Sequence, residues 1–271
     1  MENNERKLEH LLVKASSEPS QRPEFLEKLL NAEIYCIGFS DKTSPQGSSD
    51  VLPEGSQVSL IHFQNEKGET YLPFFLSLES LQKAIQDEQS YLRLPARGFF
   101  ELTLGANLVL NPYSEYGKEF FPQEVEALLQ GGYGSLLESY EYQEQREVLL
   151  GQPAEYPHEM IDQLRVLLKT KPEVKMAYLA QMHDPKRDQE PTLLIGFETD
   201  QTISDESFQR LKNQIGHVAY ESLVRKRLID LIHLDDVHAT SGLEHYLRQE
   251  TAPFYVRKKQ KEKGFFARLF S

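Results

Sequence analysis

The chain has 271 residues, 39% of them hydrophobic, and a formal net charge of -12 at pH 7. This length exceeds one typical small domain and suits two, each large enough to bury a core without metals or disulfides. No run of 18 apolar residues is present, and the charged N-terminal segment lacks the apolar core of a secretory signal. We therefore expect a cytoplasmic protein without a membrane-spanning helix.

The first half of the chain mixes helical and strand patterns. Apolar residues at helical spacing predict helices over residues 4–17 and from Pro23 onward, and an apolar run around Cys36 predicts a buried strand. Two strands flanking Lys67-Gly68 suggest a hairpin, and shorter elements follow up to the helix that begins at Pro122. This order predicts a mixed α/β sheet domain over residues 1–138.

The second half has a clearer order of elements. Apolar residues alternate from Val174 to Met182, which predicts a strand with one buried face. With the neighbouring helices and strands the order is β-α-β-β-α-β, the order of ferredoxin-like domains. We therefore expect residues 146–256 to form a ferredoxin-like domain with an antiparallel sheet and both helices on one face. The predicted fold class is α+β, in two domains.

Known catalytic and metal-binding signatures are incomplete in this sequence. Gly117-Lys118 matches only the end of a phosphate-binding loop, and in the run from His158 to Asp162 an aspartate replaces the second histidine of a zinc-protease helix. The richest ligand cluster can be explained by turn capping and surface polarity, although a metal or catalytic role stays open; it contains His233, Asp235, Asp236, His238 and His245. We predict no catalytic residue, no metal site and no cofactor.

The single cysteine, Cys36, excludes an internal disulfide. It lies in an apolar run that is typical of a buried strand, where burial raises the pKa of a thiol. We expect Cys36 to be a core residue that the protein's activity does not need.

A polar and aromatic stretch runs from Asn111 to Phe121, and two arginines precede it. One interpretation is an ordered turn that leads to the helix at Pro122. The other is a partner-binding surface, since loops on a rigid scaffold often carry recognition. Both segments would share one exposed face if the strands on either side of the predicted helix 96–104 pair. The candidate binding residues are Arg93, Arg97, Asn111, Tyr113, Glu115, Tyr116 and Lys118.

Residues 257–271 form a tail that carries six basic side chains and one acidic one, a charge of +5, whereas the rest of the chain carries -17. The tail can pack on its own domain, dock in a partner groove or make weak peripheral contact with a membrane; stable membrane insertion is not expected. The candidate binding residues are Lys263, Phe265, Phe266, Arg268, Leu269 and Phe270. We expect a docking segment for an unknown protein partner, and the acidic body disfavours nucleic acid.

Several segments resemble the enhanced serine sensitivity (SseB) protein family. They are Tyr71-Leu72-Pro73-Phe74-Phe75-Leu76-Ser77-Leu78-Glu79, Tyr91-Leu92-Arg93-Leu94-Pro95-Ala96-Arg97, Leu108-Val109-Leu110 with Asn111 to Lys118, and the C-terminal Lys-Gly-Phe-Phe-Ala-Arg-Leu-Phe. The resemblance extends over almost the whole chain and includes a separate C-terminal domain. It implies a bacterial protein linked to a growth phenotype with serine, and it assigns no reaction and no catalytic residue.

Together these features favour a non-enzymatic binding or regulatory protein that acts through protein contacts. The alternative is an enzyme or a small-molecule sensor of amino-acid or sulfur metabolism, which the serine phenotype and the ferredoxin-like order suggest by analogy.

Overall fold

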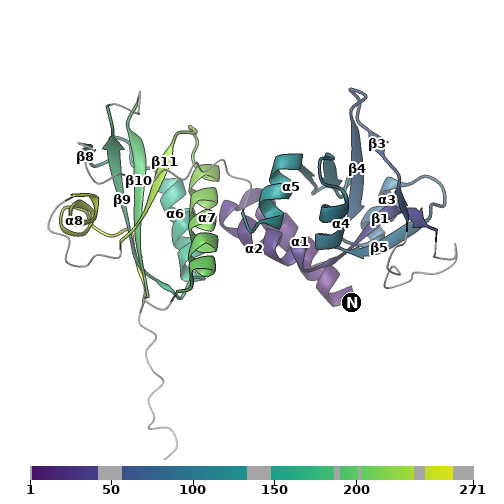
Figure 1. The fold of residues 1–271 in the computed structure, drawn as a ribbon, viewed down its shortest axis with the longest axis horizontal. Helices are drawn as coiled ribbons and strands as arrows, with labels where there is room; N and C mark the ends of the chain where they lie inside the picture. Colours follow the sequence, from purple (N-terminus) through teal and green to yellow (C-terminus); the bar gives the residue numbers. More distant parts are fainter. Residues whose placement is uncertain are drawn as a thin grey trace, which may run out of the picture. The chain divides into compact units, whose positions relative to one another are not determined.

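The structure is a computed structural model of the chain, and it is α+β with helices and two mixed sheets (Figure 1). The chain divides into two units, Met1–Ser139 with Gln209–Ser222, and Tyr140–Phe208 with Leu223–Ser271. The residues that the structure describes are 2–41, 57–132, 148–185, 190–200, 203–234 and 242–258.

The elements of the first unit follow the predicted order, with two differences. They are α1 Glu2–Ser17, the 3₁₀ helix η1 Pro19–Gln21, α2 Arg22–Leu30, β1 Glu33–Ser40, β2 Val58–Leu60, β3 Phe63–Gln64, β4 Thr70–Phe75, α3 Leu78–Ala84, β5 Tyr91–Pro95, α4 Ala96–Leu102, β6 Leu108–Leu110, β7 Lys118–Phe120 and α5 Pro122–Leu129. The predicted strand 58–63 is two strands, β2 and β3, and the predicted turn before Pro122 contains an additional strand, β7.

Among the described residues, these strands form one seven-stranded sheet. Its central part has the order β5-β1-β4-β6-β7, in which β4 and β6 are parallel and the other pairs are antiparallel. Strand β2 pairs with the end of β1, and β3 pairs with β4. The hairpin β6–β7 therefore lies at one edge of the central part, and β5 lies at the opposite edge.

The sheet buries both faces because side chains alternate along each strand. On one face, α1, α2, α4 and α5 cover the larger core, in which the ring of Phe74 lies 5.3 Å from that of Phe99 and 5.8 Å from that of Phe120. On the other face, α3 covers a smaller core around Tyr35 and Phe75. Within the described residues, fewer helices cover this second face than the first.

The strands on either side of α4 do not pair with each other. Strand β5 pairs with β1 over five residues, from Glu33↔Pro95 to Ile37↔Tyr91, while β6 pairs with β4. The physical reason is that Leu92 and Leu94 of β5 and the apolar side chains of β1 contribute to the same larger core. Arg93 is therefore separated from the β6–β7 hairpin by β1 and β4.

The elements of the second unit also follow the predicted order, including a last helix that the capping box Ser241-Gly242-Leu243-Glu244 predicts, and one short strand is added at the end. They are β8 Leu149–Gly151, α6 His158–Lys169, β9 Val174–His183, β10 Thr192–Thr199, α7 Asp205–Glu221, β11 Ile229–His233, α8 Gly242–Gln249 and β12 Tyr255–Val256. Helix α7 begins in this unit, and its residues from Gln209 onward group with the first.

The second sheet does not have the predicted antiparallel arrangement. Its order among the described residues is β11-β10-β9-β12, with β8 also on β9, and β10 and β11 are parallel. Helix α7 connects β10 to β11, and a helical crossover between neighbouring strands of one sheet makes them parallel. The sheet is therefore mixed, and its sequential strand order differs from the interleaved order of ferredoxin-like domains.

Helix α8 packs on one face of this sheet, where Leu247 lies in a core with Tyr178 and Leu194. An added Cβ at Gly196 would lie 2.6 Å from a methyl carbon of Leu247, so a larger residue there would force this side chain to move. Helix α6 lies on the opposite face (Figure 1). The sheet of the second unit is thus covered by α8 on one face and by α6 on the other.

Candidate binding site

The turn of the β6–β7 hairpin begins at Asn111, which is a structural residue. Its side chain is only 4% exposed, and its backbone adopts a φ of 48°. The backbone N–H of Asn111 donates to the Phe74 carbonyl at 2.8 Å, and its side-chain oxygen accepts the Leu76 N–H at 3.1 Å. Asn111 therefore fastens the hairpin to the end of β4, as the ordered-turn interpretation expects.

The hairpin also needs a glycine where its two arms meet. A Cβ added to Gly117 would lie 2.7 Å from the backbone oxygen of Leu110. Only a residue without a side chain allows this close approach of the two strands. The Gly117-Lys118 pair that resembles a phosphate-loop ending is therefore explained by hairpin geometry.

The remaining side chains of the turn differ in exposure. Tyr113 is 69% exposed, and Glu115 is exposed as well. Tyr116 is half-buried against the larger core, and its hydrogen bond with Glu115 raises the pKa of the Tyr116 phenol. The turn thus presents Tyr113 and Glu115 to solvent and keeps Asn111 inside.

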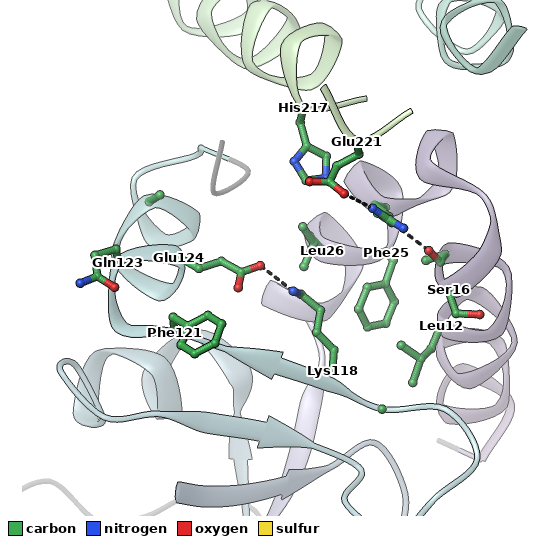
Figure 2. Close-up of a pocket in the computed structure, with 14 residues that line it drawn as sticks. Leu12, Ser16, Phe25, Leu26, Lys118, Phe121, Gln123, Glu124, His217 and Glu221 are labelled. Atoms are coloured by element: carbon green, nitrogen blue, oxygen red, sulfur yellow. Dashed lines mark hydrogen bonds and ion pairs between the residues drawn. The ribbon is translucent and has the colours of Figure 1, made fainter. Parts of the chain in front are cut away.

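Lys118 points from β7 toward α5. Its ammonium group lies 2.7 Å from a carboxylate oxygen of Glu124 and 4.7 Å from the centre of the Phe120 ring. A cation in this position is stabilised by the carboxylate and by the negative face of the ring. Figure 2 shows this ion pair at the side of a hollow.

The hollow lies between α1, α2, β7 and α5, and it has a volume of about 890 Å³ (Figure 2). The part of α7 that groups with the first unit also lines it, and there Arg22 and Glu221 form an ion pair at 2.6 Å. The side chain of Phe121 is 57% exposed at its border. The apolar part of the lining consists of Leu12, Ala15, Phe25, Leu26, Phe121 and Ala127.

Several polar side chains of the lining are engaged with neighbouring groups, and the lining also includes His217 and Gln123. Its hydroxyl group, that of Ser16, donates to the Val13 carbonyl at 2.7 Å, which is a bond within helix α1. The ion pairs place each carboxylate of Glu124 and Glu221 against a cation.

Cys36 is buried away from this lining, and burial raises the pKa of its thiol to about 12. The thiol therefore stays protonated at neutral pH, and the thiolate is the reactive form. We expect Cys36→Ala to cost about 1 kcal/mol of stability and to restore normal growth on serine in a deletion strain. Loss of complementation by a folded Cys36→Ala protein, checked by circular dichroism, would favour a thiol-dependent activity.

The hollow includes only Lys118 of the seven candidate residues from the first half of the chain. Arg93 lies on the edge strand β5, with its guanidinium 5.9 Å from the centre of the Tyr35 ring. Arg97 is exposed on α4 and donates to the Leu129 carbonyl at 3.4 Å. The two arginines thus lie on β5 and α4, outside the β6–β7 hairpin that carries the turn.

The tail residues predicted to bind a partner lie outside the described residues; they are Lys263, Phe265, Phe266, Arg268, Leu269 and Phe270. Arg257, at the start of the tail, is part of the fold of the second unit. The Arg257 guanidinium forms an ion pair with Asp200 at 2.7 Å, and the backbone N–H of Arg257 donates to the Lys175 carbonyl at 2.8 Å. The tail proper therefore starts after Arg257.

The histidine and aspartate cluster of the second half is only partly described. Residues 235–241 lie outside the described residues, whereas His233 is hydrogen-bonded to Thr199 at 2.8 Å and lies 4.7 Å from the Phe208 ring. Among the residues that the structure describes, no group of three or more potential ligands could hold a metal ion. None of the described helices is long and apolar enough to cross a membrane.

Sequence patterns did not reveal the apolar side of the hollow. Leu12, Phe25 and Leu26 follow ordinary helical spacing, which is equally typical of a closed core. The available signal was Phe121, a large apolar residue directly before the helix-starting Pro122, where a polar capping residue is usual.

Fold and site together define a two-unit α+β protein with an apolar hollow bordered by ion pairs in its first unit. The sequence comparisons agree with this two-part organisation. Residues 8–127 match the SseB protein N-terminal domain, and residues 142–257 match the SseB protein C-terminal domain.

The chain belongs to the SseB family. It is 38% identical over 259 residues to Protein SseB of Escherichia coli (strain K12), which covers 95% of each chain. Protein SseB of Shigella flexneri has the same identity and coverage. No solved structure gives a significant match.

Proposed function

We propose that this protein is a non-enzymatic cytoplasmic protein that binds a partner protein through the hollow of its first unit. The observation that carries the proposal is an apolar lining next to the exposed ring of Phe121, with charged groups at its sides. Centres of protein interfaces commonly combine a large aromatic side chain with a pocket and a polar surround. The link to serine sensitivity comes from the family alone.

The pairing of the charges supports a protein partner over a small polar metabolite. Sites for small molecules need several polar groups that converge on the ligand. In this hollow Lys118 is engaged by Glu124, and Arg22 by Glu221 and by the Ala15 carbonyl. An apolar side chain of a partner needs no such groups, since its burial alone is favourable.

A small-molecule sensor is the second candidate, and the size of the hollow favours it. The volume of about 890 Å³ falls in the range of about 300–1,000 Å³ that is usual for ligand pockets. Thermal unfolding with serine, other amino acids and thiol metabolites tests this candidate. A rise in Tm that saturates with one of them, and that Phe121→Glu abolishes, would support a sensor over a protein-binding role.

The proposed protein contact predicts a large effect of Phe121→Glu. A charge at this exposed position should leave the fold intact and reduce partner capture from native lysate at least about 10-fold, because interface hot spots carry most of the binding energy. Leu102→Glu is the matched control, since Leu102 is 64% exposed on α4 and does not line the hollow. Equal capture by both variants would argue against the hollow as the contact.

A further inference from the structure

Three aromatic residues form a patch beside the hairpin; we call Phe63, Tyr71 and Tyr113 the aromatic patch. The Phe63 ring lies 6.0 Å from that of Tyr71 and 6.4 Å from that of Tyr113. Phe63 packs against the smaller core, whereas Tyr113 is mostly exposed. The patch therefore extends from the partly buried Phe63 ring to the exposed Tyr113 ring.

The backbone at Tyr113 adopts an unfavourable conformation. Its φ of 64° lies in the left-handed region, which is rare for a residue with a bulky side chain. The buried Asn111, two residues upstream, fastens the turn, and the Tyr113 ring lies 6.4 Å from the Phe63 ring. Unfavourable backbone conformations persist where the surrounding structure enforces them, and they cluster at functional positions.

A carboxylate lies on the same face of the sheet. Glu119 pairs in register with Val109, which pairs with Pro73, two residues from Tyr71. Burial, the neighbouring Tyr113 phenol and the nearby charge of Glu119 together raise the pKa of Tyr71 to about 12. Glu119 is exposed, as is Glu115 in the turn.

The net charge of the first unit has the same sign as these two carboxylates. The stretches Met1–Ser139 and Gln209–Ser222 contain 22 acidic and 13 basic side chains, a net charge of -9. A field of this sign attracts basic partners and repels acidic ones.

We propose that the aromatic patch and Glu119 bind an arginine or lysine side chain of a basic peptide segment in a partner. A guanidinium stacks on the face of a tyrosine ring, and a carboxylate at the side neutralises it. The patch lies on the face opposite the larger core, because Glu119 and Phe120 are consecutive on β7 and Phe120 belongs to that core. This surface is thus distinct from the proposed hollow contact and goes beyond it.

The test uses the full chain labelled with 3-fluorotyrosine and titrated with an Arg-Lys-Arg amide in 150 mM salt, followed by ¹⁹F NMR. An Asp-Glu-Asp peptide is the control for charge. We expect saturable shifts of the Tyr71 and Tyr113 signals with the basic peptide and none with the acidic one. Tyr91, which is partly exposed on β5, should not shift and reports on nonspecific binding.

Two variants at Tyr113 separate a binding role from a structural one. Tyr113→Gly accepts the left-handed backbone without strain and removes the ring, so it should keep the fold and weaken the peptide about 5-fold. Tyr113→Phe keeps the ring and should change the affinity less than about 2-fold, while Glu119→Gln should weaken it about 3-fold.

The proposal is overturned if Tyr113→Gly binds the basic peptide as tightly as the natural chain, or if no saturable shift occurs at Tyr113. Unfolding by Tyr113→Gly would show that the ring is needed structurally, and the Glu119→Gln titration then decides: unchanged affinity also overturns the proposal. Partner capture through Phe121 is measured independently, so failure of one contact is distinguishable from failure of the other.

Discussion

Asn111→Ala is expected to lower the free energy of unfolding by about 2–4 kcal/mol. The substitution leaves the buried Leu76 N–H without its side-chain acceptor, which costs about 1–3 kcal/mol. It also places an alanine at a φ of 48°, and the left-handed region costs such a residue about 1 kcal/mol more. Urea denaturation followed by circular dichroism measures the change.

Three further variants separate these two contributions. Asn111→Gly accepts the backbone and loses the acceptor, so it should cost less than alanine. Asn111→Asp keeps an acceptor oxygen and should recover most of the stability. Asn31→Ala is the control, because Asn31 is exposed and its side chain donates to the Glu27 carbonyl at the end of its own helix. Equal losses at the two asparagines would contradict the structural role of Asn111.

Arg248→Ala is expected to destabilise the second unit by about 3 kcal/mol. The Arg248 side chain is only 12% exposed, and its guanidinium lies 3.3 Å from Glu198 and donates to the Leu234 carbonyl at 2.8 Å. Tyr178 donates to the same Glu198 carboxylate at 3.2 Å. Removal of one partner from a nearly buried network leaves the other charge uncompensated, which costs about 3–5 kcal/mol when burial is complete.

The control for Arg248 is Arg225→Ala in the same unit. Arg225 lies 3.5 Å from Glu190, but both side chains are largely exposed, so the loss should stay below about 0.5 kcal/mol. A double cycle with Glu198→Gln isolates the pair energy, since the two groups interact directly. Comparable losses from Arg248→Ala and Arg225→Ala would show that α8 is held by its apolar contacts alone.

Much of the fold could be predicted because its elements have strong local signals. The buried strand around Cys36, the alternation from Val174 to Met182 and the helix at Pro122 are all observed. Strand partners were less predictable, because several strands offer equivalent apolar faces. Strand β5 joined β1 instead of β6, and the α7 crossover made β10 and β11 parallel.

Only part of the candidate site was predictable from the sequence. The polar-aromatic run from Asn111 to Lys118 was visible in the sequence, but its inward and outward side chains could not be separated without the hairpin geometry. Asn111 turned inward to satisfy Leu76, whereas Tyr113 stayed exposed. The hollow is assembled from helices and a strand that are distant in the chain, so no local pattern indicates it.

The most direct test of the proposed protein contact is site-specific photocrosslinking in the native cell. A benzoyl-phenylalanine at position 121 places the reactive group at the border of the hollow, and the same residue at position 102 samples an exposed apolar position outside it. We predict a discrete adduct with a second protein from position 121 and none from position 102. Absence of an adduct at position 121, or the same adducts from both positions, would contradict a partner contact through the hollow.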